Sequence, residues 1–187
     1  MAEFNSKQYW EDRYYKGGNS GDGSYGVSAN LKSNYINSII EKYNIQTIND
    51  LGHGDGNQIG LLKGFKQYTG YDVSSSARER CILQYKDNRR YTFIDSISQF
   101  KPSDLVMSLD VLYHLTEYEV FEAYLKDLFS LGEYVLIYAQ DKETKGDNHV
   151  VSRRFTPYIE SVYDNFSLED ISDGSHDMVK FYLYKRL

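Results

Sequence analysis

The sequence predicts an α/β fold in which a doubly wound, mostly parallel sheet carries helices on both faces, and three observations support this prediction. Apolar segments of strand length alternate with segments whose apolar residues recur at helical spacing. A glycine-rich turn follows the first apolar strand, and an acidic residue ends the second. The fourth expected strand is apolar at nearly every position, as a strand covered on both faces should be.

Each expected element follows from a local pattern along the chain. The first core helix spans 28–43, because its apolar residues form one stripe. Strands are expected over 47–51, 68–72, 91–94, 105–109 and 134–139, with helices starting at 59 and spanning 74–85 and 116–129. A polar loop over 141–154 and a short helix over 156–163 precede a C-terminal antiparallel strand pair, 166–171 and 179–184.

Finer expectations concern two of these helices. Thr116 and Glu119 match a capping box at the start of the helix over 116–129. The buried face of that helix is expected to hold Val120, Phe121, Tyr124, Leu125 and Leu128. The helix over 74–85 is expected to turn Ala77, Cys81, Ile82 and Tyr85 inward.

The composition suits one domain over 1–187, because a chain with 41% hydrophobic and 26% charged residues can bury one sizeable core. We expect a core over 28–187 and a lid-like N-terminal segment over 1–27, with a Gly/Ser-rich stretch at 17–26. No apolar run reaches the roughly 18 residues of a membrane span, and the N-terminus has no signal-peptide core. Cys81 is the single cysteine, so no internal disulfide can form. These features favour a cytoplasmic protein without a membrane partner.

The charge balance argues against a nucleic-acid partner. A net charge of −6 is unusual for a protein whose main task is to grip a phosphate backbone. Two local clusters are basic despite the negative net charge. Each is either solvated surface or a contact for an anionic acceptor. They are the set Arg78, Arg80, Lys86, Arg89 and Arg90, and the pair Arg153 and Arg154.

The strongest functional signal is the sequence D-L-G-H-G-D-G-N over 50–57, which follows an apolar strand. Glycine lets the backbone turn sharply there and approach a ligand. Asp72 ends the next strand, where a carboxylate can accept hydrogen bonds from both hydroxyls of a ribose. A nicotinamide or flavin site would need G-x-G-x-x-G, and the match fails at Asn57. A tight turn that holds no ligand is the structural alternative.

These residues together resemble the class I S-adenosylmethionine-dependent methyltransferases, over roughly 9–187. Motif I of that superfamily matches 50–57, motif II matches Asp72, and an acid after the third strand matches Asp95. The resemblance implies a Rossmann-like domain with S-adenosylmethionine as its cofactor. Segments 9–14, 17–26, 108–115 and 149–156 also resemble a subgroup of small bacterial and viral methyltransferases that look associated with glycan or surface-polymer modification.

The resemblance also implies which residues touch the cofactor. Gly52 and Gly54 would lie against its methionine part, which Leu109 and Asp110 would border. Asp72 would hold the ribose, and Asp95 with Ser96 would lie near the adenine amino group. His53 departs from the usual small residue or cysteine and either faces solvent or packs on the cofactor. The full expected set is Trp10, Arg13, Asp50, Gly52, His53, Gly54, Asn57, Asp72, Val73, Asp95, Ser96, Leu109 and Asp110.

Methyl transfer to a hydroxyl needs an aligned acceptor and a base. His114 follows the fourth strand, and an unperturbed imidazole titrates near about pH 6.5. Asp110 lies four residues earlier and would orient His114 if the segment is helical. His149, in the polar loop, is the second candidate base. The alternative for each histidine is a structural role.

Acceptor contacts are expected from two regions. A guanidinium of Arg153 or Arg154 would fit an acidic or phosphorylated acceptor. The Gly/Ser-rich segment would fold over the site as a lid, or else form a mobile tail. As a lid, the segment would bring four residues to the cofactor or the acceptor: Trp10, Arg13, Tyr14 and Tyr25. Tyr113 is expected as a further contact with the acceptor. No metal is expected, since the spacing of Asp110, Asp141 and His149 is a weak signal.

Three functions stay open. The preferred one is an S-adenosylmethionine-dependent methyltransferase that acts on a hydroxyl of a small molecule or glycan sugar. The second is a methyltransferase acting on RNA, a nucleotide or a cap-like end. The third is a regulatory subunit that binds the cofactor without catalysis, because motif I and Asp72 argue only for binding.

Overall fold

A computed structural model describes residues 4–146, 149–175 and 178–187 of the chain. The first three residues of the expected N-terminal segment and residues 147–148 of the expected polar loop lie outside the described residues.

A seven-stranded sheet forms the centre of the described structure, in the order β3-β2-β1-β4-β5-β9-β8. Strands β1 to β5 are parallel, while β9 runs antiparallel to both β5 and β8. The expected parallel sheet with a C-terminal antiparallel pair is confirmed. The bounds are β1 (Thr47–Leu51), β2 (Gln67–Tyr71), β3 (Tyr91–Ile94), β4 (Ser103–Leu109), β5 (Gly132–Ala139), β8 (Phe166–Asp173) and β9 (Lys180–Arg186).

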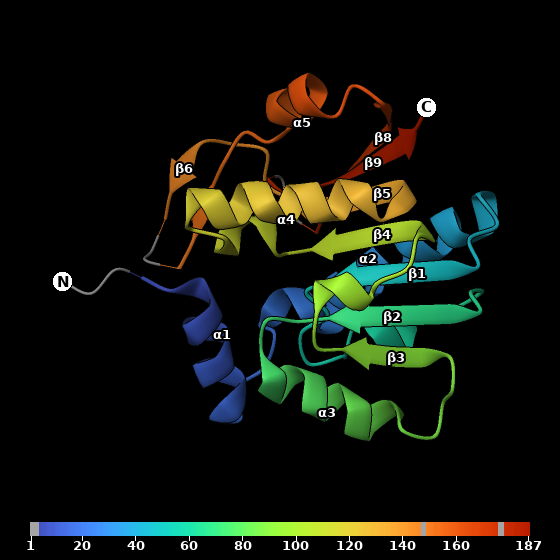
Figure 1. The fold of residues 1–187 in the computed structure, drawn as a ribbon, viewed down its shortest axis with the longest axis vertical. Helices are drawn as coiled ribbons and strands as arrows, with labels where there is room; N and C mark the ends of the chain where they lie inside the picture. The colour runs from blue at the N-terminus through green and yellow to red at the C-terminus, as the bar shows by residue number, and fades with distance from the viewer. Residues whose placement is uncertain (1–3, 147–148, 176–177) are drawn as a thin grey trace.

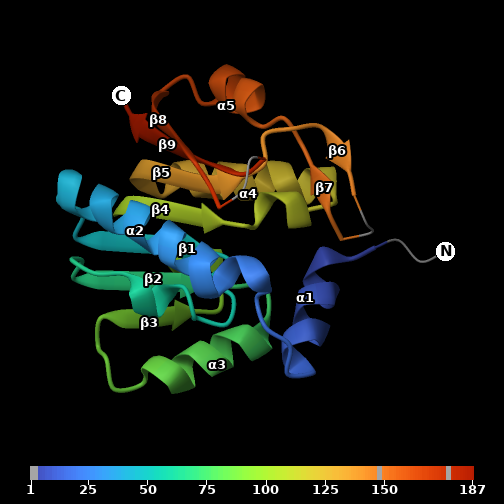
Figure 2. The same ribbon diagram turned by 180° about the vertical axis from the view of Figure 1, so that it is seen from behind.

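Helices cover both faces of this sheet (Figures 1 and 2). They are α1 (Ser6–Tyr15), α2 (Gly26–Lys42), α3 (Ser75–Tyr85), α4 (Tyr118–Ser130) and α5 (Thr156–Val162). Helix α2 lies on one face, α4 and α5 lie on the other, and α3 runs beside β3. Helix α1 lies across the carboxyl edge of the sheet, where the arrowheads of β2, β3 and β4 point (Figure 1).

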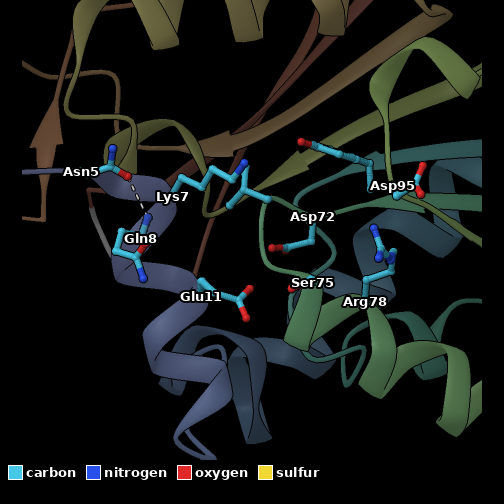
Figure 3. A pocket seen from close by; sticks show the side chains of 10 residues that line it. Asn5, Lys7, Gln8, Glu11, Asp72, Ser75, Arg78 and Asp95 are labelled. Carbon is cyan, nitrogen blue, oxygen red and sulfur yellow. Dashed lines mark hydrogen bonds between the residues drawn. The ribbon is translucent and has the colours of Figure 1, made fainter.

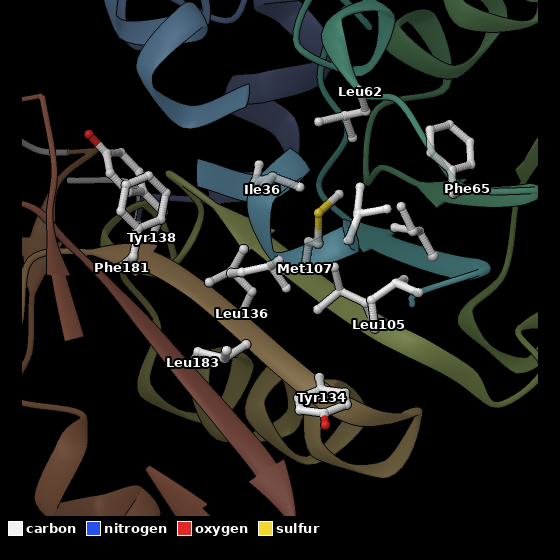
Figure 4. Packing of buried hydrophobic residues seen from close by; sticks show 14 of the residues in the cluster. Ile36, Leu62, Phe65, Leu105, Met107, Tyr134, Leu136, Tyr138, Phe181 and Leu183 are labelled. Atoms are coloured by element: carbon white, nitrogen blue, oxygen red, sulfur yellow. The ribbon is translucent and has the colours of Figure 1, made fainter. Parts of the chain in front are cut away.

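Alternation along the central strands divides the interior into two cores. Leu105 and Met107 of β4 and Leu136 of β5 join the core under α2, shown in Figure 4. Val106 and Ile137 join the core under α4 and α5. Successive strand residues point to opposite faces, so a strand covered on both faces is apolar throughout.

The strand order creates the place for a ligand. After β1 the chain continues outward to β2 and β3, then returns to lay β4 on the other side of β1. The connections therefore diverge between β1 and β4. In open α/β sheets, ligands bind beyond the carboxyl ends of the strands at such a switch point.

Some local expectations were wrong. The helix expected to start at 59 is one 3₁₀ turn, η2 (Ile59–Leu61). Helix α4 starts at Tyr118 after Glu117, without a side-chain cap, because the Thr116 hydroxyl donates to the Glu117 carboxylate instead. The side chains of Ile82 and Val120 are 47% and 43% exposed.

The remaining short elements connect the larger ones. The polar loop contains a small hairpin of β6 (Thr144–Lys145) and β7 (Val151–Ser152). Three further 3₁₀ turns are η1 (Asp22–Ser24), η3 (Ile97–Gln99) and η4 (Leu112–His114).

Helix α1 was not expected from the sequence. Only Ser6 and Tyr14 of α1 are buried, so no apolar stripe announces it. Its one local signal is Asn5, whose side chain accepts a hydrogen bond from the Gln8 backbone N–H as an N-cap.

Among the described helices, none combines the length and apolar character that crossing a bilayer requires.

Candidate cofactor and acceptor site

A cavity of about 780 Å³ opens at the carboxyl ends of β1, β2 and β4. Its walls come from the turn after β1, from α1 and η1, and from η4 and the first turns of α4. A smaller cavity of about 380 Å³ lies between α1 and α3 (Figure 3). Both cavities are lined by Asn5, Lys7, Tyr71, Asp72 and Val73, so they meet at the end of β2.

The glycine-rich turn forms the inner wall of the larger cavity. Gly52 and Gly54 have φ values of 105° and 60°, which side-chain-bearing residues rarely adopt. A Cβ atom at Gly52 would overlap Val111, and one at Gly54 would overlap Ser20. Glycine is therefore required both by the backbone conformation and by close packing.

Asp72 lies where the sequence places a ribose ligand. Its two carboxylate oxygens accept hydrogen bonds from the backbone N–H groups of Gly54 and Ser74, each at 2.9 Å. A carboxylate oxygen has a second lone pair, so both remain able to accept from hydroxyls in the cavity. Asp95 and Arg78 both line the smaller cavity (Figure 3), while Ser96 caps η3.

Two residues that line the larger cavity each have a buried oxygen atom without a hydrogen-bond partner among the residues that the structure describes. The two atoms are Oδ1 of Asp50 and Oε1 of Gln58. Oδ2 of Asp50 accepts from the Tyr68 hydroxyl at 2.6 Å. Burial raises the pKa of Asp50 to about 7, because a desolvated carboxylate is costly. A buried oxygen without a donor is costly, so each of these atoms needs a partner beyond the described side chains.

His53 packs inside the glycine-rich turn and lines the cavity rather than facing solvent. Its Nδ1 lies 2.8 Å from the Gly54 carbonyl oxygen, and its ring meets Phe93 edge-on. Burial lowers the pKa of His53, so the ring is neutral near pH 7.

Asp110 does not orient His114, contrary to expectation. Its Oδ2 pairs with Lys32 Nζ at 2.6 Å, and its Oδ1 accepts from the Tyr113 hydroxyl at 2.7 Å. The residue has φ 61°, so the chain turns sharply after β4 and η4 carries His114 away from the carboxylate. Leu109, Asp110 and Tyr113 all line the larger cavity.

His114 also lines the larger cavity, and His149 contacts His114. The Nδ1 atom of His114 lies 3.0 Å from the backbone oxygen of His149. Since a carbonyl can only accept, this contact assigns the ring proton to Nδ1 and leaves Nε2 with the lone pair. The two imidazoles stack with centroids 5.7 Å apart, and Trp10 meets His114 edge-on at 4.8 Å. Burial lowers the pKa of His114.

The N-terminal segment docks on the glycine-rich turn. Ser20 and Asp55 exchange two hydrogen bonds, of 2.8 and 2.9 Å, and the Tyr25 hydroxyl donates to Asp55 at 2.7 Å. The Asn57 side chain donates to the Ser24 carbonyl at 2.6 Å. Tyr25 and Asn57 thus join the segment to the turn, while Tyr14 and Trp10 line the cavity.

The three arginines that were expected to contact the cofactor or the acceptor either donate to main-chain carbonyls or are exposed. Arg13 donates through Nε to the Asn19 carbonyl at 2.6 Å. Arg153 donates to the carbonyls of Leu115 and Thr116, both at 2.6 Å, and the Arg154 side chain is exposed. This geometry does not support their expected contacts with cofactor or acceptor, because main-chain carbonyls already hold Arg13 and Arg153.

Sequence reasoning missed several cavity residues. Lys32 lies four residues before Ile36 on the apolar stripe of α2, and a lysine on a buried face is a signal that could have been used. Other charged or polar lining residues without a comparable local signal include Lys7, Ser20, Asp22, Gln58, Glu117 and Asp127. Within the described residues, no group of three or more His, Cys, Asp or Glu side chains is placed to hold a metal ion.

Solved structures show the same fold. Magnesium protoporphyrin IX methyltransferase (ChlM) from Synechocystis PCC 6803 with bound SAM aligns at TM-score 0.74 and 18% identity, covering 100% of both chains. The N-methyltransferase NodS from Bradyrhizobium japonicum WM9 aligns at TM-score 0.71 and 14% identity, covering 98% of this chain and 99% of its own. The methyltransferase domain of bacterial CtHen1-C aligns at TM-score 0.67 and 22% identity, covering 84% and 97%.

No protein-family model matches the chain, and no curated protein matches it. These structural likenesses show that the chain shares the fold of these three methyltransferases.

Proposed function

We propose that this protein is an S-adenosylmethionine-dependent methyltransferase that methylates a hydroxyl of a small molecule or glycan sugar. One observation carries the proposal: the glycine-rich turn, Asp72 and a neutral histidine with a free Nε2 line a single cavity at the switch point. Asp72, whose two carboxylate oxygens keep free lone pairs beside the glycine-rich turn, fits the cofactor's ribose. ChlM and NodS hold SAM and S-adenosylhomocysteine in this fold.

Each residue of the site would have a separate role in methyl transfer. The glycine-rich turn, Asp72 and Val73 would hold the cofactor, which supplies a methyl group on an electrophilic sulfonium. His114 would accept the hydroxyl proton at Nε2, because its Nδ1 is engaged by the His149 carbonyl. His149 would be a positioning residue that fixes the tautomer and the ring orientation. Trp10 and Tyr113 would form the walls beside the acceptor.

The charge of the cavity favours this function over methylation of RNA or a nucleotide. Its lining includes the carboxylates of Asp22, Asp110, Glu117, Glu119 and Asp127, whereas lysines enter only as Lys7 and Lys32 among the lining residues described. Lys32 is already paired with Asp110. A phosphate-bearing acceptor would meet net repulsion, since nucleic-acid sites are lined by basic residues.

The test is an acceptor screen with the purified protein, S-adenosylmethionine and a panel of sugars, glycan fragments, phenols and RNA, with methyl transfer detected by mass spectrometry. For an acceptor that is methylated, His114→Gln should lower kcat by about 10²- to 10⁴-fold while S-adenosylhomocysteine binding persists. His149→Ala removes the stacked ring but keeps the backbone carbonyl, so it should lower kcat less.

Either of two results would contradict the proposal. Tight cofactor binding with no transfer to any acceptor favours a non-catalytic regulatory subunit. Transfer to RNA but to no sugar or phenol favours the nucleic-acid alternative.

A further inference from the structure

A series of aromatic rings connects helix α1 to the candidate base. The Tyr9 ring of α1 stacks on the His149 imidazole, with centroids 4.9 Å apart and planes at 19°. The His149 imidazole in turn stacks with that of His114, with centroids 5.7 Å apart and planes at 8°. Both separations are typical of favourable ring contacts. His149 therefore links Tyr9 to the histidine at the cavity.

Helix α1 has anchors of its own, so it can hold Tyr9 in place. The Ser6 backbone N–H, at the start of α1, donates to the Glu117 carboxylate at 3.0 Å. On the next turn, Glu11 accepts from the Ser76 hydroxyl of α3 at 2.6 Å. The helix is thus tied to the start of α4 and to the start of α3, on either side of Tyr9.

The position of His149 controls the tautomer of His114. The Nδ1 atom of His114 lies 3.0 Å from the His149 backbone oxygen, which can only accept, so the ring proton is on Nδ1. Without this partner the proton is free to move to Nε2. In that form Nε2 has no lone pair and cannot take a proton from a hydroxyl.

Tyr9 and His149 act from outside the cavity. Neither is among the residues that line the two cavities, whereas His114 lines the larger one. Trp10, the neighbour of Tyr9, meets the His114 ring directly and edge-on at 4.8 Å. Helix α1 therefore reaches the candidate base by two routes, one direct and one through His149.

We propose that Tyr9 is a positioning residue for methyl transfer, whose ring holds His149 so that the backbone carbonyl of His149 keeps the His114 proton on Nδ1. The inference rests on the proposed function only in taking His114 as the base. The tautomer of His114 is a property of the protein alone and is measurable without an acceptor.

The test is the nitrogen NMR spectrum of the imidazole rings in the intact protein at about pH 8, where histidines are neutral. The chain has four histidines, and His114→Gln identifies the signals of His114 by their loss. A nitrogen that bears the proton and one that has a lone pair differ widely in chemical shift. We expect the Nδ1–H form in the wild type and a marked gain of the Nε2–H form in Tyr9→Leu.

Two other variants on α1 separate ring stacking from general effects. Tyr9→Phe keeps the ring and should retain the wild-type tautomer. Tyr15→Leu makes the same change on the same helix, at a side chain that is 80% exposed, and should leave the His114 signals unchanged. For an acceptor that is methylated, Tyr9→Leu should lower kcat by about tenfold with KM for S-adenosylmethionine unchanged, and Tyr9→Phe should restore kcat.

A double variant shows whether Tyr9 acts through His149. His149→Ala removes the ring that Tyr9 contacts but keeps the backbone carbonyl and the other anchors of α1. If the stack is the route, Tyr9→Leu/His149→Ala should change the ratio of the two His114 tautomers no further than the stronger single variant does. A larger change in the double variant would give Tyr9 a separate effect, through the docking of α1, and would overturn the inference.

Two further results would also overturn it. One is an unchanged His114 tautomer in Tyr9→Leu, and the other is an equal change in Tyr15→Leu. Neither result touches the proposed cofactor or reaction. Failure to methylate every acceptor in the screen would overturn the proposed function and leave the control of the tautomer standing.

Discussion

Burial changes the chemistry of single residues at this site, and Asp50 is the clearest case. The carboxyl group is fully buried at the end of β1, and desolvation outweighs the hydrogen bond from Tyr68 and the attraction of Lys32. Its pKa rises to about 7, compared with 3.8 for an ordinary aspartate. Asp50 therefore titrates near neutral pH.

The same shift predicts how stability depends on pH. Between about pH 4 and pH 7 the unfolded chain releases the Asp50 proton and the folded chain keeps it, so stability falls as pH rises. Asp50→Asn should flatten this decline, so that the wild type loses about 2 kcal/mol more than the variant between pH 5 and pH 8. Urea unfolding at both pH values measures this difference.

The exposed Asp87 provides the control for Asp50, because Asp87→Asn should leave the wild-type pH dependence unchanged. Parallel pH profiles of the wild type and Asp50→Asn would contradict the raised pKa.

Close packing at Gly52 gives a second prediction at this scale. Gly52 and Gly17 both have positive φ, 105° and 83°, but a Cβ overlaps Val111 only at Gly52 and meets nothing within 4 Å at Gly17. Gly52→Ala should therefore lower the free energy of unfolding by about 2 kcal/mol more than Gly17→Ala. Thermal unfolding of the two variants measures this difference. An equal loss of stability in both would mean that backbone strain alone requires glycine at position 52.

Helix α1 and the segment that follows it are held by contacts distant in sequence. Arg80 of α3 donates to the carbonyls of Tyr14 and Gly18, both at 2.8 Å. Glu11 of α1 accepts from the Ser76 hydroxyl at 2.6 Å, and this bond lowers the pKa of Glu11 to about 2. Both contacts come from α3, so α3 holds the N-terminal segment, whose residues Trp10 and Tyr14 line the cavity.

Arg80→Met should therefore loosen the N-terminal segment without unfolding the core. We expect hydrogen exchange over 6–25 to accelerate by about tenfold, because two charge-assisted hydrogen bonds are lost. Trp10 is the single tryptophan and lies on α1, so its fluorescence should report the same change.

Arg89→Met is the matched control for Arg80, since Arg89 is an exposed arginine just after α3. Unchanged exchange in Arg80→Met would mean that the segment is held by other contacts, such as the Ser20–Asp55 pair.

At the scale of the whole molecule, β5 joins the two cores. Leu136 faces the core under α2 and Ile137 faces the core under α4, and both side chains are 0% exposed. Because adjacent residues of one strand anchor both layers, we expect the layers to unfold together.

Leu136→Ala and Ile137→Ala should each lower the free energy of unfolding by about 2–5 kcal/mol. Far-ultraviolet and near-ultraviolet circular dichroism should give coincident transitions in both variants. Leu168→Ala, at a side chain 37% exposed on β8, should cost less than about 1 kcal/mol. Separate transitions for the two spectral regions would contradict the single cooperative unit.

The sequence by itself determined the features that depend on local order. Periodicity places the strands and most helices within a few residues, since a period of 2 or 3.6 is fixed by neighbours in the chain. The glycine-rich turn and Asp72 were likewise readable, because each belongs to one strand end and its turn. Element ends were less exact, as the missing cap at Thr116 shows.

Only the tertiary structure decided the contacts between distant segments. Lys32 and Asp110 are 78 positions apart, and His114 and His149 are 35 apart, so no local pattern could announce either pair. The same holds for α1, whose place is fixed by α3 and the glycine-rich turn rather than by an apolar stripe of its own. Side chains as far apart as these meet only when the sheet brings its strand ends to one edge, which is the physical reason that their pairing could not be predicted from the sequence.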